Sequence, residues 1–131
     1  MMAQGAYISA ATILEGYLEN DPDNRLLIEL LLNCYAELKA YDKSEALLQK
    51  QIEKNPDDFR NRYLLLELYL KSGSDTLVAD QVNYIVAANK GNRDIYGTVI
   101  RLLINYGQND LAQSLIEKGR KEFNHPEFFA I

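Results

Sequence analysis

The sequence predicts an all-α fold in which antiparallel helix pairs stack into a right-handed α-solenoid. Pro22 and Pro56 lie 34 residues apart in similar surroundings, Asp21-Pro22-Asp23-Asn24 and Asn55-Pro56-Asp57-Asp58. Between such turns, apolar residues recur at spacings of three and four, the pattern of a helix with one buried face. The 131 residues are 47% hydrophobic and 25% charged, the balance of a single globular domain.

Further columns of residues align at the same 34-residue interval. One column holds Ala10, Ser44, Val78 and Ala112, and another holds Leu14, Leu48, Val82 and Ile116. Gly73 and Gly107 also lie one interval apart, and Gly5 lies two intervals before Gly73. Because one helix pair cannot bury its apolar face alone, three neighbouring pairs are expected to share a continuous core.

The first element expected is a single helix in residues 6–24. It matches the second helix of a pair whose first helix is missing, and Tyr7, Ala10 and Leu14 stand in the columns of Tyr41, Ser44 and Leu48. The apolar end 126–131 resembles the start of another unit or a cap. Two interpretations stay open: one complete domain over 1–131, or a segment of a longer protein.

Three helix pairs follow, in residues 25–58, 59–92 and 93–126. The first pair is expected to break at 39–42 and to end at Asn55-Pro56, because proline cannot donate the hydrogen bond that a continuing helix needs. The second turns at Ser72-Gly73-Ser74, and its second helix, about 76–89, stops at Gly91. The third is expected over 94–105 and 110–123, with its hinge at Gly107.

These residues resemble the tetratricopeptide repeat (TPR) family, whose period is 34. Residues 25–58 fit its pattern best, through Leu31, Tyr35, Tyr41, Ser44, Leu48 and Pro56. The family's usual tryptophan is absent from the whole chain. The resemblance implies a non-enzymatic scaffold that binds a peptide or helix of a partner protein in the groove lined by the first helices of the pairs.

Carried onto this sequence, the predicted groove spans all three pairs. Its residues are Leu26, Glu29, Asn33, Glu37, Arg60, Tyr63, Glu67, Leu70, Lys71, Asp94, Arg101, Ile104 and Asn105. Glu29 and Glu67 would repel an acidic tail, so a basic or amphipathic partner segment fits better. Bacterial members often serve envelope, pilus, secretion or export assemblies, and the resemblance implies such a setting.

Composition weighs against an enzyme and against cofactors. The single Cys34 lies on an apolar helical stripe and is expected in the core. The single His125 has no second ligand or nucleophile beside it, so no catalytic, cofactor or metal site is predicted. The acids at 21–24 and 55–58 are expected to cap helices rather than bind calcium.

Net charge and hydropathy limit the partners. The net charge of −5 and the scattered basic residues argue against nucleic acid. No apolar stretch is long enough to cross a membrane, so a soluble protein of the cytoplasm or periplasm is expected. Two alternatives to the scaffold remain: an interaction segment of a larger enzyme, and a homo-oligomeric array that self-associates through its ends.

Overall fold

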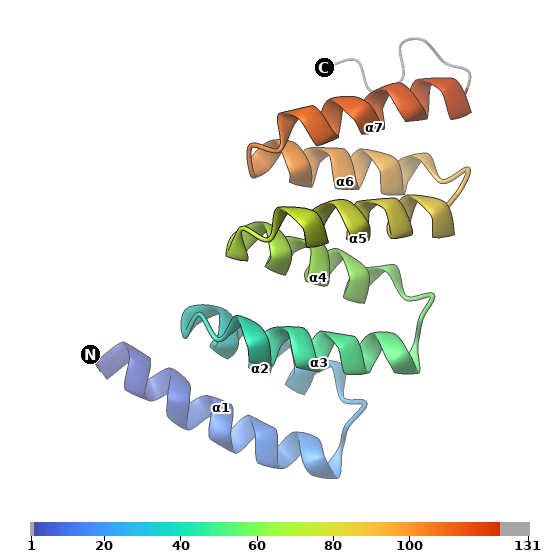
Figure 1. Cartoon of the computed structure of the whole chain (residues 1–131). Helices are drawn as coiled ribbons and strands as arrows, with labels where there is room; N and C mark the ends of the chain where they lie inside the picture. The colour runs from blue at the N-terminus through green and yellow to red at the C-terminus, as the bar shows by residue number, and fades with distance from the viewer. Residues whose placement is uncertain (1, 124–131) are drawn as a thin grey trace. The chain divides into compact units, whose positions relative to one another are not determined.

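The structure, a computed structural model, describes residues 2–123, with side chains from residue 4 onward. This part of the chain folds into helices, with no strand (Figure 1). The helices are α1 (Met2–Asn20), α2 (Arg25–Glu37), α3 (Tyr41–Lys54), α4 (Phe59–Ser72), α5 (Asp75–Ala88), α6 (Arg93–Asn105) and α7 (Asn109–Glu122). His125 and the apolar end 126–131 lie outside the described residues.

Every helix predicted from the periodicity is present, with small differences at its ends. Helix α1 begins at Met2, four residues earlier than predicted. Helix α3 begins at Tyr41, so the predicted break over 39–42 is shorter, and Tyr41 and Asp42 are already helical. The apolar pattern locates helix interiors well, but it carries no information about the first turn, where side chains need not be buried.

The chain forms two compact units, of which the first is Met1–Pro56. In this unit α2 packs against both α1 and α3. Its core cluster contains Ala11, Leu31, Cys34 and Tyr35, with Tyr7, Ala10, Leu14, Leu18, Ala40 and Leu47 packed against it. The prediction that Cys34 is a core residue is confirmed, because its side chain is buried as a free thiol.

The second unit is Asp57–Ile131, in which α4 packs on α5, α6 packs on α7, and α6 also contacts α4 and α5. Its most completely buried side chains come from three of these helices: Leu65, Leu66, Ile85, Tyr96, Val99 and Leu103 are 0% exposed. Burial of this many large apolar side chains is the main source of stability in such a unit.

Polar caps and left-handed turns delimit the helices. The side-chain oxygens of Asn24 and Asp58 accept hydrogen bonds from the backbone N–H groups of Leu27 (3.2 Å) and Arg60 (3.0 Å), so the predicted capping role is confirmed. Gly73 (φ 74°) and Gly107 (φ 76°) adopt the left-handed conformation that a tight turn after a helix requires.

Candidate partner-binding surfaces

In the first unit, the predicted site residues lie on one exposed stripe of α2. Leu26 is 64% exposed, and Leu30, one turn further on, is 42% exposed. Glu29 accepts a hydrogen bond from the Arg25 guanidinium at 3.3 Å, which partly neutralises its carboxylate. Asn33 and Glu37 continue the stripe and are exposed. The stripe therefore offers leucine side chains beside an acidic edge.

In the second unit, α4 presents a narrower strip. Tyr63 and Glu67 are half-buried, and Lys71 is exposed. The Tyr63 ring is tilted against the Phe59 ring, with centroids 5.9 Å apart, and the Lys71 ammonium lies 3.8 Å from the Glu67 carboxylate. Tyr63 and Glu67 therefore each have a neighbour on α4 itself.

Two predicted residues of α4 have other roles. Leu70 is only 8% exposed, so its inclusion among the surface residues is corrected: it belongs to the core. Arg60 is exposed, but its guanidinium donates to both carboxylate oxygens of Asp58, at 3.2 and 3.0 Å. That pairing holds Arg60 at the first turn of α4, beside the cap.

Helix α6 supplies the remaining predicted residues. Asp94, Arg101, Ile104 and Asn105 are all exposed, and Ile104 retains 38% of its surface. Arg101 and Ile104 are three residues apart, so they are neighbours on one face of the helix. Asp94 lies in the first turn, two turns away from Arg101.

The structure brings Tyr63, Glu67 and Arg101 together, and adds Tyr106 to them. Burial raises the pKa of the Tyr63 phenol; the Glu67 carboxylate and the Tyr106 phenol raise it further, and Arg101 lowers it. The Glu67, Tyr106 and Arg101 groups therefore lie within electrostatic range of the Tyr63 phenol. We call Tyr63, Glu67, Arg101 and Tyr106 the α4/α6 surface.

Tyr106 is the member of this surface that sequence reasoning missed. It is the residue after the last turn of α6, and it is 37% exposed. Helical periodicity assigns a face only within a helix, so it makes no prediction for a residue at the cap. The sequence did offer one signal for Tyr106: it is an aromatic residue directly before the Gly107 turn.

Neither a metal-binding group nor a membrane-spanning helix is found in the described part of the chain. Within residues 2–123, no group of three or more His, Cys, Asp or Glu side chains could hold a metal ion. Among the helices described here, none is long and apolar enough to cross a membrane. Cys34 is enclosed by leucine and tyrosine side chains, an environment in which a thiol acts as a small apolar group.

Comparisons with known proteins agree with the fold. A family model described as tetratricopeptide repeat matches residues 1–69, more than half of the chain. No curated protein matches. The solved structure MamA MSR-1 C2 matches with a TM-score of 0.54 and 22% identity, over 94% of this chain and 70% of that chain. This likeness confirms the all-α, TPR-like helical solenoid predicted from the sequence. Because the family model covers the whole first unit and more than half of the chain, the chain belongs to the tetratricopeptide repeat family.

Proposed function

We propose that this chain is a non-enzymatic scaffold module that holds a peptide or helix of a partner protein on the exposed faces of its first helices. Membership of the tetratricopeptide repeat family supports the general role in protein–protein interaction. The partner, the residues that touch it and the assembly in which it works are our proposals.

The α4/α6 surface is the observation that carries the proposal. There the Tyr63 phenol lies within electrostatic range of an acid, a base and a second tyrosine, and its ring packs against Phe59. Tyrosine and arginine are the residue types most enriched where binding energy is concentrated, because they combine large contact area with hydrogen bonding. A surface of this kind loses little side-chain entropy when a partner binds.

The charges on both units favour a basic or amphipathic partner segment. In the first unit, Glu37 is exposed and Glu29 stands beside exposed Leu26. In the second unit, Glu67 supplies the carboxylate of the α4/α6 surface. A helix with an apolar stripe and flanking Lys or Arg would complement such faces. From the family resemblance alone, we place the module in a bacterial envelope, pilus, secretion or export assembly.

The test is a pull-down with the purified chain, read by mass spectrometry, followed by titration of the captured partner. The variant Tyr63→Ala/Glu67→Lys removes the α4 half of the surface. The control is Gln113→Ala/Glu117→Lys, which makes a charge reversal and a truncation at the same four-residue spacing on exposed positions of α7. We expect the first variant to weaken partner binding by more than tenfold and the control to bind like the wild type.

Circular dichroism must show equal helicity for both variants. If both bind equally well, the α4/α6 surface is not the site. A captured protein with catalytic activity of its own would leave the scaffold role intact. Activity in the purified chain would contradict it.

Self-association is a second candidate, favoured by the exposed face of α1. Ile8, Ile13 and Tyr17 are 54%, 56% and 60% exposed, a large apolar share for one helix. Light scattering over a hundredfold concentration range tests it. A constant monomer mass excludes the array, whereas a mass that rises with concentration and falls in Ile13→Glu supports it.

A further inference from the structure

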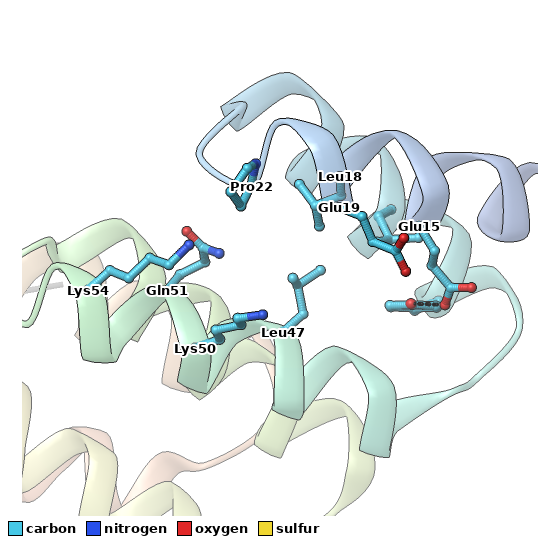
Figure 2. Close-up of a pocket in the computed structure, with 10 residues that line it drawn as sticks. Glu15, Leu18, Glu19, Pro22, Leu47, Lys50, Gln51 and Lys54 are labelled. Atoms are coloured by element: carbon cyan, nitrogen blue, oxygen red, sulfur yellow. Dashed lines mark hydrogen bonds between the residues drawn. The ribbon is translucent and has the colours of Figure 1, made fainter.

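The first unit contains a cleft that the sequence analysis did not foresee. It has a volume of about 520 Å³ and lies over α2, with α1 on one side and α3 on the other. Apolar side chains from all three helices line it, namely Leu18, Leu31 and Leu47. In Figure 2, Leu18 and Leu47 extend toward one another across it. Its volume falls in the range of pockets that hold a small ligand or a few residues of a peptide.

A buried polar side chain opens into this cleft. Gln51, on α3, is only 5% exposed, yet its side chain lines the cleft, and Figure 2 shows its amide on the Pro22 side. None of the described residues hydrogen-bonds that amide. Its amide atoms are not among the buried atoms that lack a partner, so they reach solvent through the cleft, and one carbonyl and one NH₂ group are available to a ligand there.

The two rims of the cleft carry opposite charges. Glu15 and Glu19 stand on α1, and Lys50 and Lys54 stand on α3. One residue of each pair is already engaged: Glu15 accepts the Tyr35 hydroxyl, and Lys54 lies 3.2 Å from Asp23. Glu19 and Lys50 have no partner among the described residues. The open charges are therefore one carboxylate on α1 and one ammonium on α3.

We propose that this cleft is a binding site for an extended peptide segment in which an apolar residue stands between a basic and an acidic residue. The apolar side chain enters between Leu18 and Leu47. The Gln51 amide pairs with the peptide backbone, donating to a C=O and accepting from an N–H. The basic side chain meets Glu19, and the acidic one meets Lys50.

Each feature of the cleft selects this ligand class over others. An extended backbone leaves its N–H and C=O groups unpaired, as Gln51 requires, whereas a helical backbone is already satisfied. The apolar floor does not suit a free anion or cation, and charges of both signs on the rims do not suit a ligand with one sign. The site lies wholly in the first unit, so it is separate from the α4/α6 surface.

The experiment is an NMR titration of the ¹⁵N-labelled chain with acetyl-Gly-Lys-Leu-Glu-Gly-amide. We expect shifts of the Gln51 side-chain NH₂ and of backbone amides in residues 15–22 and 47–54, with α4 and α6 unchanged. The peptide with Ser in place of Leu should bind at least tenfold more weakly. Shifts confined to α4 and α6 would overturn this site and leave the proposed function standing.

Two variants separate recognition from folding. Gln51→Leu removes the amide from a buried position that tolerates an apolar side chain, and it should weaken the peptide about tenfold. Gln49→Leu, on the exposed side of the same helix, should bind like the wild type. Lys50→Glu replaces the open ammonium on the α3 rim by a carboxylate. This variant should prefer the peptide with Lys in place of Glu, and misfolding cannot produce such a gain in affinity.

Three results would overturn the proposal. The first is an absence of shifts at millimolar peptide, which would leave the cleft to solvent. The second is an unchanged preference in Lys50→Glu. The third is a dependence of the same shifts on protein concentration without peptide, which would make a second copy of the chain the occupant.

Discussion

Replacing Lys39 by glycine should stabilise the protein, because Lys39 occupies a position that the repeat otherwise gives to glycine. Lys39 is the only non-glycine residue with positive φ, at 55°, among the residues that the structure describes. It lies one 34-residue interval before Gly73 and two before Gly107, which have φ of 74° and 76°. In all three places the N–H of the next residue donates to the C=O five residues back: Ala40 to Tyr35 (2.8 Å), Ser74 to Tyr69 (3.0 Å) and Gln108 to Leu103 (2.9 Å).

The magnitude follows from two opposing terms. A side chain in the left-handed conformation costs about 1–2 kcal/mol. Glycine gives the unfolded chain extra freedom, which costs about 0.4–1 kcal/mol of stability. Lys39→Gly should therefore raise the free energy of unfolding by about 0.8 kcal/mol.

Urea denaturation followed by circular dichroism measures this change. A lysine near the C-terminus of α2 also interacts favourably with the helix dipole, so the titration is run in about 0.5 M salt, where that contribution is screened. Lys50→Gly, in the interior of α3, is the matched control and should lose about 1 kcal/mol. If Lys39→Gly and Lys50→Gly lower the free energy of unfolding equally, at an unchanged dependence on urea, the left-handed conformation of Lys39 does not destabilise the protein.

Three further changes test the fold. Asn24→Ala removes the side-chain oxygen that accepts from Leu27 and should lower the free energy of unfolding by about 1 kcal/mol in urea. Leu65→Ala, at 0% exposure, should cost about 2–5 kcal/mol, whereas a comparable change at the exposed Leu26 should cost under about 0.5 kcal/mol. Burial, and then the hydrogen bond to Glu15, raise the pKa of Tyr35 above its ordinary value. This contribution to stability is complete below the pKa of an unfolded tyrosine, about 10, and is lost as the pH rises above it. Denaturation at pH 8 and pH 11 should show a smaller alkaline loss in Tyr35→Phe than in the wild type.

The helices could be predicted because the same apolar spacing recurs in three helix pairs at an interval of 34 residues. The sequence also predicted the burial of Cys34 and the capping by Asn24 and Asp58, since each depends on local chemistry that a single helix or turn contains. It missed Lys39, because nothing in a lysine signals a left-handed turn. It missed the cleft beside Gln51, because a cavity depends on how far apart α1 and α3 lie, and periodicity does not report distance.

The sequence analysis placed Leu70 on the binding surface, but the structure buries it. Its burial limits which residues of α4 can contact a partner in the second unit. From Leu68 to Leu70 three successive side chains are buried, and so are Leu65 and Leu66 before them, so this half of α4 is enclosed on nearly every side. In this half of α4, the accessible side chains include Glu67 and Lys71, which form a strip with Tyr63 at four-residue spacing. Two of these side chains already contact neighbours, Tyr63 with Phe59 and Glu67 with Lys71.

On α6 the side chains of the predicted surface are more exposed than those on α4. Arg101 and Ile104 are exposed, and Tyr106 at the end of the helix is 37% exposed. Substitutions on α4 should therefore weaken the binding of all partners to a similar degree, because they remove side chains that already pack against neighbours on the same helix. Substitutions of Arg101 or Ile104 should change which partner is preferred. Comparing Tyr63→Ala with Arg101→Glu against a basic and an acidic amphipathic peptide tests this division. Equal effects of the two variants on the ratio of the two affinities would contradict it.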